Sequence, residues 1–246
     1  MSSSLTPKIT NIVWGQFNGR CARCDILLSR TMDDGTSATI GKIAHIVGEN
    51  EGSARFTTEL SLSKRNSPDN LMLLCGTHHD EIDNYHSEYS VEDLHKIKND
   101  FLKRLSSIFQ ENLLNIGFAE LDVTISYLVQ GTTTKYDGTL KLIPPAEKIA
   151  KNELSSDVED LLRMGLVRED QLEDYLNKNL DSSFSSRLRN IIVEKYNSVK
   201  AAGLSPDEIF YEMLSFSSGG SNDFKRQAAG LTVIAYYFNV CDIFEK

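Results

Sequence analysis

The spacing of apolar and polar positions changes several times along the first hundred residues, and each change predicts an element. Residues 37–47 are rich in Thr, Ile and Val with partial alternation, which predicts strands that lead to His45. Residues 48–67 are polar and include glycines, which predicts a long loop of the kind that is uncommon unless it is functional. We then expect a short apolar strand over 71–74 and a helix over 76–84. This order of elements outlines a ββα unit.

A longer helix is expected to close this first part of the chain. Ser90 stands where a helix N-cap belongs, and Asp93 takes the position from which an acid completes a capping box. The apolar residues of this segment recur at helical spacing, and they are Val91, Leu94, Ile97, Phe101, Leu105 and Ile108.

The pattern changes again beyond that helix. Ala119–Val129 and Thr139–Ile143 are strand-like, and Gly131 and the Asp137–Gly138 turn lie between them, which predicts a β-hairpin that also serves as a linker. The pair Pro144–Pro145 then interrupts the chain. Helical segments are expected after it, at about 155–164, 168–179, 183–201, 206–216 and 222–244.

Taken together, these elements predict an α+β protein in three parts. Residues 1–112 form a domain around the ββα unit, 113–144 form the β-hairpin linker, and 145–246 form a helical bundle. The bundle contains a clear helix start, in which Ser205 is the N-cap and Pro206 occupies the first helical position.

Composition narrows the ways in which the chain could meet nucleic acid. The net charge is −9 and both halves are acidic, so no basic domain is present to bind phosphate. Contacts with DNA must therefore come from bound metal or from local cationic clusters. These clusters are Arg20, Arg23 and Arg30; Lys42; Lys64 and Arg65; and Lys96, Lys98, Lys103 and Arg104.

The chain is expected to be cytoplasmic and to have no membrane partner. Its first eight residues lack the apolar core of a secretory signal. The longest apolar stretch, Ala228–Phe238, is far shorter than the roughly 20 residues that span a bilayer. Three of the four cysteines stand at zinc-ligand spacing, which favours a reducing compartment, and Cys241 is expected to be a small buried apolar residue.

All five histidines and three of the four cysteines fall between positions 21 and 95. Cys21 and Cys24 form one knuckle, and Cys75 and His78 form a second, so the two together can hold a tetrahedral structural zinc ion. Neighbouring positions on a helix point about 100° apart, which leaves His79 free to face a second metal.

The N-terminal half resembles the HNH endonuclease family. The residues that carry the resemblance are Cys21 and Cys24, Ala44–Ile46, the run Lys64–Cys75, His78 and His79, and Ile82 and Asp83. The resemblance implies a zinc-stapled ββα-metal domain that cleaves DNA with a divalent cation and leaves 5′-phosphate and 3′-hydroxyl ends.

The same resemblance implies roles for individual side chains. His45 would be the general base that deprotonates the attacking water, since an imidazole titrates near neutrality. Asn70 has two readings: it offers its carbonyl oxygen to the catalytic metal, or it orients the loop and strand around His45. His79 would be a ligand of that metal. His86 and His95 are expected to be surface or packing residues.

One position departs from the family pattern. Many members place Asp, Glu or His directly before the base, as a metal ligand, whereas this chain has Ala44. The resemblance then leaves His79 and Asn70 as ligands, with Asp69 or Asp83 as further candidates and water in the remaining positions. Imidazole ligation favours Mn²⁺ or Ni²⁺, and Mg²⁺ is kept as an alternative.

The C-terminal half resembles the C-terminal module of effectors in bacterial ABC three-component (Lamassu-like) anti-phage defence systems. The matching segments are Pro145–Ile149, Lys151–Leu154 and the ending Gln227–Lys246. The resemblance implies that this module couples the nuclease to an ABC ATPase of the SMC or Rad50 type. We also expect it to form a homo-oligomer.

Two classes of function follow. The first is a metal-dependent DNA endonuclease that acts as an anti-phage effector. The second is a zinc-stapled adaptor or DNA-binding module whose nuclease site is inactive, a reading that Ala44 supports.

Overall fold

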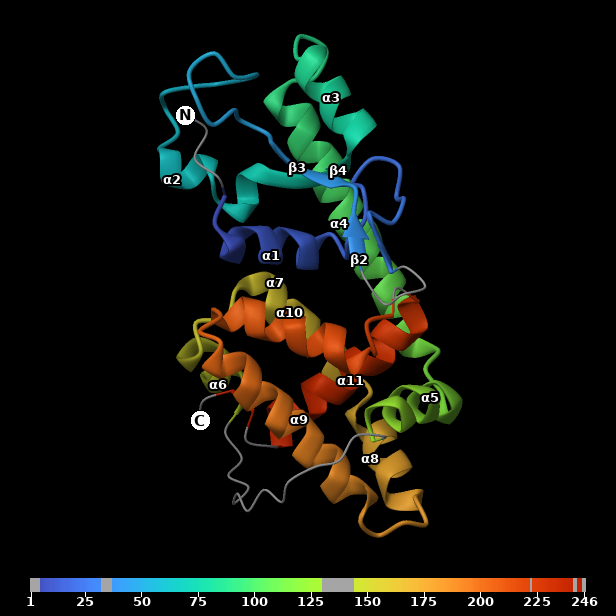
Figure 1. Ribbon diagram of the computed structural model, residues 1–246. Coiled ribbons are helices and arrows are strands. Elements are labelled where there is room, and N and C mark those ends of the chain that lie inside the picture. The colour runs from blue at the N-terminus through green and yellow to red at the C-terminus, as the bar shows by residue number, and fades with distance from the viewer. Residues whose placement is uncertain (1–4, 32–36, 130–143, 222, 241–242, 245–246) are drawn as a thin grey trace. The chain divides into compact units, whose positions relative to one another are not determined.

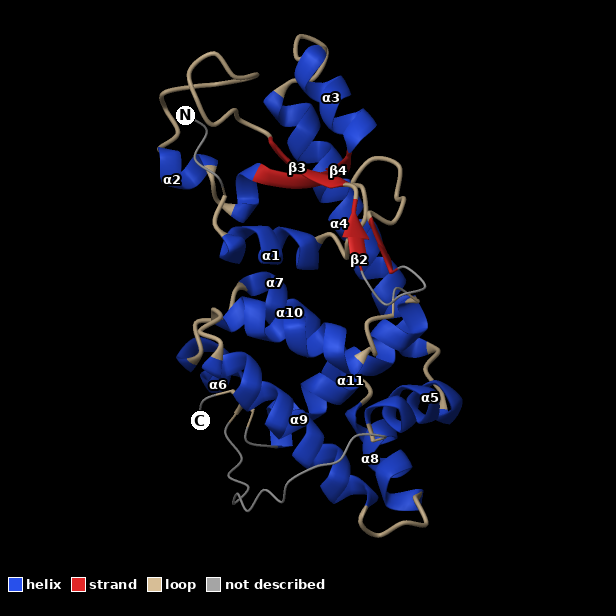
Figure 2. Ribbon diagram, in the orientation of Figure 1, coloured by secondary structure: helices blue, strands red, loops and turns tan. Residues whose placement is uncertain are grey.

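The computed structural model describes residues 5–31, 37–129, 144–221, 223–240 and 243–244 (Figure 1). The chain divides into two compact units, Met1–Ser106 and Ser107–Lys246. Strands occur, among the described residues, only between positions 29 and 75, and the second unit is helical (Figure 2). The expected α+β class is therefore confirmed at this level.

The elements of the first unit begin with a helix that the sequence pattern did not predict. They are α1 (Pro7–Gln16), β1 (Ser29–Thr31), β2 (Ser37–Thr39), β3 (Gly41–His45), α2 (Leu62–Arg65), the 3₁₀ turn η1 (Pro68–Asn70), β4 (Leu71–Cys75), α3 (Gly76–Asn84) and α4 (Val91–Leu114). The last of these continues into the second unit.

The ββα unit forms as expected from β3, β4 and α3. The two strands pair antiparallel, with Ile43 opposite Leu73 and His45 opposite Leu71. Every residue of β4 is buried, as its uninterrupted apolar sequence requires. The strand ends at Cys75, which is also the residue before the first turn of α3. The second knuckle, Cys75 and His78, therefore lies at the junction of β4 with α3.

Helix α1 packs against the start of β3. Thr6 caps it by accepting a hydrogen bond from the Ile9 N–H, and Pro7 occupies its first turn. A Cβ atom at Gly41 would lie 2.8 Å from the Trp14 ring, so only glycine admits this close approach. The local signal for this helix was the Thr–Pro pair.

The second unit is built around α11 (Phe224–Val240), which is buried along most of its length. Two glycines let neighbouring helices approach one another closely. A Cβ at Gly165 of α7 would lie 2.6 Å from the Ala235 Cβ, and a Cβ at Gly230 would lie 2.5 Å from the Ser218 Oγ that follows α10. The surrounding helices are α5 (Phe118–Leu128), α6 (Pro145–Lys151), α7 (Ser156–Leu166), α8 (Glu169–Lys178), α9 (Phe184–Ala201) and α10 (Pro206–Ser217).

The prediction of a β-hairpin after α4 is wrong for the first half of that segment. Residues 119–129 lie largely in α5 rather than in a strand. Leu121, Ile125 and Leu128 recur at helical spacing and are buried in the helical core, and the Glu120 carboxylate accepts the Gly117 N–H at 2.9 Å to cap the helix. The second expected strand, Thr139–Ile143, and its turn lie outside the described residues.

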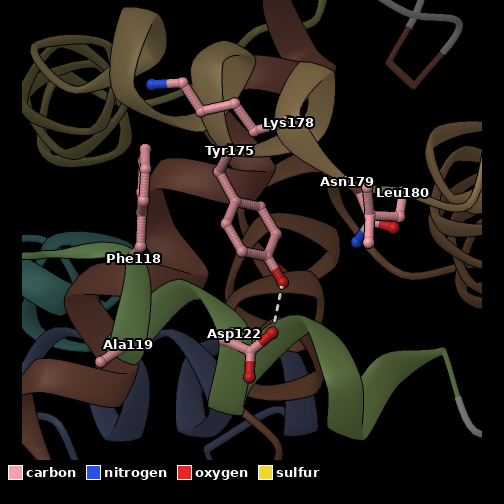
Figure 3. Close-up of a pocket in the computed structure, with 7 residues that line it drawn as sticks. All are labelled: Phe118, Ala119, Asp122, Tyr175, Lys178, Asn179 and Leu180. Atoms are coloured by element: carbon pink, nitrogen blue, oxygen red, sulfur yellow. Dashed lines mark hydrogen bonds between the residues drawn. The ribbon is translucent and has the colours of Figure 1, made fainter.

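Helices α5 and α8 are tied together at the surface of the second unit. The Tyr175 hydroxyl donates to Asp122 Oδ1 at 2.8 Å, beside a shallow cavity of about 570 Å³ (Figure 3). Burial and the Asp122 carboxylate raise the pKa of Tyr175, so this hydroxyl stays protonated and acts as a donor. The lining residues are Phe118, Ala119, Asp122, Tyr175, Lys178, Asn179 and Leu180.

Candidate metal centre and nuclease site

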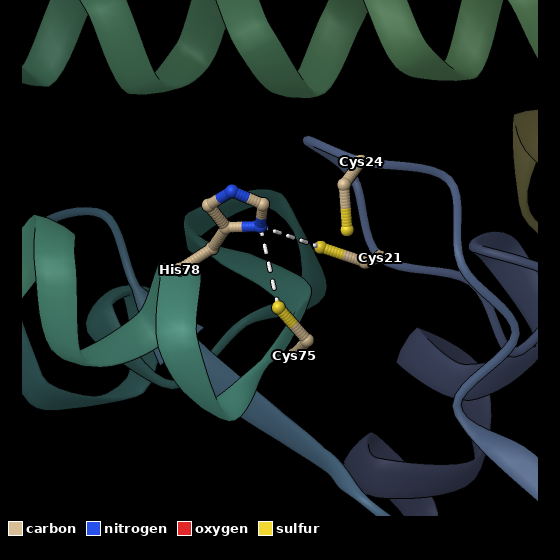
Figure 4. Close-up of side chains that lie close together, drawn as sticks. All are labelled: Cys21, Cys24, Cys75 and His78. Carbon is tan, nitrogen blue, oxygen red and sulfur yellow. Dashed lines mark hydrogen bonds between the residues drawn. The ribbon is translucent and has the colours of Figure 1, made fainter.

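Four side chains from the two knuckles converge at one point of the first unit (Figure 4). The ligand atoms of Cys21, Cys24, Cys75 and His78 all lie within 4.8 Å of one another. The His78 Nδ1 atom lies 3.5 Å from the Cys21 sulfur and 3.2 Å from the Cys75 sulfur. The structure thus brings together the four residues expected to share the structural zinc.

These distances fit a tetrahedral zinc ion. With Zn–S bonds of about 2.3 Å and a Zn–N bond of about 2.0 Å, the edges of the tetrahedron are on the order of 3.5 Å. Three thiols and one imidazole are a donor set that zinc prefers, and they leave no open position for a substrate. The cluster can therefore bind zinc as a structural staple.

Local backbone contacts bring the knuckles together. The Ala22 N–H donates to the Leu73 carbonyl at 2.8 Å, which fastens the first knuckle to β4. The Asp25 N–H donates to the Cys21 carbonyl at 2.9 Å and closes the turn, and Asp25 adopts a φ of 61°. Zinc binding would then link a turn, a strand and a helix at one point.

The thiols differ in their readiness to ionise. Burial raises the pKa of Cys21, but the hydrogen bonds it receives from the backbone of Cys24, Cys75 and Arg23 and from the side chain of His78 lower it to about 7. Burial and the neighbouring thiols raise the pKa of Cys24 to about 11. Zinc displaces such protons when it binds, because thiolate is the ligand form.

His45 lies at the end of β3, and a second side chain holds its ring. Its Nε2 atom is 2.7 Å from Asn66 Oδ1, and the Asn66 amide group donates to Glu49 Oε1 at 2.9 Å. Glu49 is only 5% exposed. Neither Asn66 nor Glu49 was predicted as a partner of His45, since both lie in the polar segment 48–67, where no periodicity indicates a contact.

Asn70 is buried, and its side chain forms hydrogen bonds with backbone groups. Its Oδ1 accepts the Val47 N–H at 2.9 Å, and its amide group donates to the carbonyls of Val47 and Arg65, each at 2.8 Å. These bonds join the segment after β3 to the segment before β4. These bonds are the ones that the orienting role of Asn70 requires, and the amide oxygen has a second lone pair with which it could meet the metal-ligand role.

Arg55, which was not predicted as a site residue, secures the backbone directly after His45. Its guanidinium donates to the Ile46 carbonyl at 2.8 Å and to the Ile82 carbonyl at 2.7 Å, and it contacts Asp83 Oδ1 at 3.2 Å. The Arg55 side chain is 6% exposed. A planar five-donor group can bridge β3 and α3 in this way, whereas a lysine cannot.

His79 points toward acids of its own helix. Its Nδ1 lies 3.4 Å from Asp80 Oδ1 and 3.7 Å from Asp83 Oδ2. These separations do not meet hydrogen-bond geometry, and within the described residues the buried Nδ1 has no hydrogen-bonding partner. His79 and Asp83 thus share one face of α3, because residues at i and i+4 of a helix lie one above the other.

The remaining histidines are away from this cluster of contacts. His86 is exposed, and His95 on α4 is half-buried. Burial and then the nearby Lys98 lower the pKa of His95. Neither residue shares a recorded hydrogen bond with His45 or His79.

Comparison with known protein families identifies both parts of the chain. Residues 21–87 match the HNH endonuclease family, and residues 125–245 match C-terminal domain 10 of the ABC-three component (ABC-3C) systems. The HNH match lies within the first unit, and the ABC-3C match lies within the second unit. Comparison with curated protein sequences gives no match.

The two family matches correspond to both expected resemblances. The HNH domain contains the zinc-type cluster, His45, Asn70 and His79, and it supports a nuclease that uses metal. The ABC-3C domain covers α6 to α11 and indicates a component of a defence system. None of the helices among the described residues is both long enough and apolar enough to cross a membrane.

Proposed function

We propose that the chain is a metal-dependent endonuclease that hydrolyses phosphodiester bonds in DNA, and that it is the nuclease effector of an anti-phage system controlled by an ABC-type ATPase. The observation that carries the nuclease assignment is the setting of His45. Its imidazole ends β3 of the HNH domain and is held through one ring nitrogen by Asn66. A base for hydrolysis needs such a fixed orientation.

His45 would take a proton from the attacking water. Asn66 contacts the Nε2 atom of His45, and the Nδ1 atom has no hydrogen-bonding partner among the described residues. The backbone that follows His45 is secured by Arg55 at Ile46 and by Asn70 at Val47. These two residues would act by positioning the base rather than by touching the substrate.

His79 and Asp83 would hold the catalytic cation, which is Mg²⁺, Mn²⁺ or Ni²⁺. The buried His79 Nδ1 lacks a hydrogen bond, and the Asp83 carboxylate lies beside it, so an imidazole and an oxygen ligand are available together. When bound, the cation would neutralise charge on a scissile-phosphate oxygen and on the leaving 3′ oxygen. Asn70 is proposed to orient the loop, and its alternative role as a ligand stays open to test.

Plasmid cleavage by the purified zinc-loaded protein, with Mn²⁺ or Mg²⁺, tests the proposal. His45→Ala is expected to fold normally and to lose about 10²- to 10⁴-fold of the cleavage rate, the usual contribution of a positioned base. His86→Ala is the matched control, because His86 is an exposed histidine of the same domain. Undiminished cleavage by His45→Ala would refute the mechanism.

The second candidate is a zinc-stapled adaptor or DNA-binding module with an inactive nuclease site. The observation that favours it is Ala44, which is 1% exposed and supplies no ligand before the base. In that case the wild type would bind DNA but would show no metal-dependent cleavage above the level of His45→Ala. The same plasmid assay therefore separates the two functions.

The regulatory half of the proposal rests on the match of residues 125–245 to the ABC-3C domain. We propose that this domain docks on an ABC ATPase of the SMC or Rad50 type and also associates with itself. Co-expression of the chain with an ABC ATPase of the SMC or Rad50 type from the same host, followed by affinity purification, tests the docking. Deletion of residues 145–246 is expected to abolish it.

A further inference from the structure

Three polar side chains form a relay that ends on His45. The His45 Nε2 atom contacts Asn66 Oδ1 at 2.7 Å, and Asn66 Nδ2 contacts Glu49 Oε1 at 2.9 Å. The second Glu49 oxygen accepts from Asn50 Nδ2 at 3.1 Å. Neither Asn66 nor Glu49 belongs to the zinc cluster or to the proposed site of the catalytic cation.

The chemistry of the carboxylate gives this relay a direction. Both Glu49 oxygens accept hydrogen bonds, Oε1 from Asn66 Nδ2 and Oε2 from Asn50 Nδ2, so the Asn66 side-chain group that faces Glu49 is the NH₂. The carbonyl oxygen of Asn66 then faces His45, and it can only accept. The His45 Nε2 must therefore carry a hydrogen, which leaves the lone pair on Nδ1.

The parts of the relay are held in place by backbone contacts. Gly48 begins a loop that its own N–H closes by donating to the Ala54 carbonyl at 3.1 Å, and a Cβ at Gly48 would lie 2.5 Å from that oxygen. The loop fixes where Glu49 stands. Asn66 follows the last residue of α2, and its backbone N–H donates a hydrogen bond to the Leu62 carbonyl at 3.0 Å. These backbone bonds restrict any movement of the Glu49 carboxylate away from the Asn66 amide.

We infer that Glu49 is a positioning residue that acts through Asn66 to hold His45 as its Nε2–H tautomer, so that Nδ1 is the atom that accepts the proton from the attacking water. This inference rests on the proposed function for the role of Nδ1, but the tautomer itself does not. After proton transfer the imidazolium keeps its Nε2–H bond to Asn66. The base thus passes from neutral to charged without turning its ring.

The tautomer can be measured without any cleavage. Long-range ¹⁵N–¹H NMR spectra of the zinc-loaded full-length protein distinguish Nε2–H from Nδ1–H imidazoles, and His45→Gln assigns the signals of His45. The wild type is expected to show the Nε2–H pattern for His45. An Nδ1–H pattern in the wild type would overturn the inference, whether or not the protein cleaves DNA.

Glu49→Gln tests the origin of the preference. The amide can turn either group toward Asn66, so both orientations of Asn66 become available and His45 is expected to show a mixture of tautomers. The cleavage kcat should fall about 10- to 100-fold with little change in KM, as for other residues that orient an active imidazole. Asn66→Asp, which still accepts from Nε2, should retain the Nε2–H pattern.

Glu51→Gln is the matched control, because Glu51 is an exposed carboxylate two positions along the same loop. It should leave both the tautomer and kcat unchanged. A pure Nε2–H pattern in Glu49→Gln would show that Glu49 does not set the tautomer. An Nε2–H pattern in a wild type that never cleaves DNA would instead uphold the relay and refute the nuclease.

Discussion

His78 and His79 are adjacent in sequence but meet different partners. His78 Nδ1 faces the sulfurs of Cys21 and Cys75, whereas His79 Nδ1 faces the carboxylates of Asp80 and Asp83. A helix turns about 100° per residue, so one residue can complete a zinc site while the next serves another site. At this scale a single step in sequence separates a structural role from a proposed catalytic one.

His79→Ala is therefore expected to retain stoichiometric zinc and to lose cleavage, because its imidazole is proposed to hold only the catalytic cation. His78→Ala should lose zinc, since one of four ligands is removed. Elemental analysis of the purified variants and the plasmid assay give the two readouts. Zinc lost from His79→Ala and kept by His78→Ala would mean that the two roles are reversed.

At the scale of elements, the first unit depends on the junction where β4 meets α3. Cys75 ends the strand and precedes the helix, and its sulfur reaches across to the knuckle of Cys21. Among the described residues of this unit there are two sheets of two strands each, and sheets of this size are only marginally stable by themselves. A zinc staple at the junction would supply stability that the small core lacks.

Cys75→Ser is expected to release zinc and unfold the first unit. Trp14 is the only tryptophan and packs at Gly41 of β3, so its fluorescence reports on this unit selectively. A red shift of that emission, together with loss of zinc, is the expected result. Cys241→Ser, at a position outside the described residues, should change neither signal. A folded, zinc-free wild type would contradict the prediction.

The helical unit depends instead on close approach between α7 and α11. At Gly165 an added Cβ would lie 2.6 Å from the Ala235 Cβ and 2.9 Å from the Leu231 carbonyl oxygen. The backbone oxygen cannot move aside as a flexible side chain could. The helix contact therefore requires glycine at this position, at some cost in helix propensity.

Gly165→Val should destabilise the second unit by about 1–3 kcal/mol, the usual cost of overpacking a buried contact. Urea unfolding followed by far-UV circular dichroism measures the change. The outcome that would count against the packing argument is an unchanged or higher midpoint.

At the scale of the whole molecule, charge limits how well the chain can bind DNA by itself. The net charge is −9, and several of the cations considered as phosphate contacts are paired internally. Arg23 contacts Glu81 at 2.7 Å, and Lys42 contacts Asp80 at 2.8 Å. Non-specific affinity for DNA comes mainly from free cations, so we expect a partner or several associated copies to supply it.

Residues 1–112 alone are expected to fold with zinc and to cleave DNA without regulation, with weak binding that falls further as salt is raised. Residues 145–246 are expected to associate with themselves or with the ATPase. Size-exclusion chromatography with light scattering on the two parts measures whether either part associates with itself. A C-terminal half that is strictly monomeric and does not bind the ATPase would refute the proposal.

The sequence by itself determined the elements whose signals are local. The helix over 76–84, the capping box at Ser90 and the helix start at Ser205 and Pro206 are confirmed, because periodicity and cap chemistry act within a few residues. The convergence of the four zinc-type ligands was likewise predictable from spacing, since two short knuckles admit few other uses. The identity of the bound ion stays a prediction.

Only the tertiary structure decided the remaining features. The apolar sequence of Phe118–Leu128 suits a strand or a helix, and packing of Leu121 and Ile125 in the helical core selected the helix. The contacts of Asn66 with His45 and with Glu49 span 21 and 17 positions along a loop that has no periodic pattern. Such contacts form only once the loop has folded, because no local sequence pattern indicates which polar residues far apart in the chain will pair.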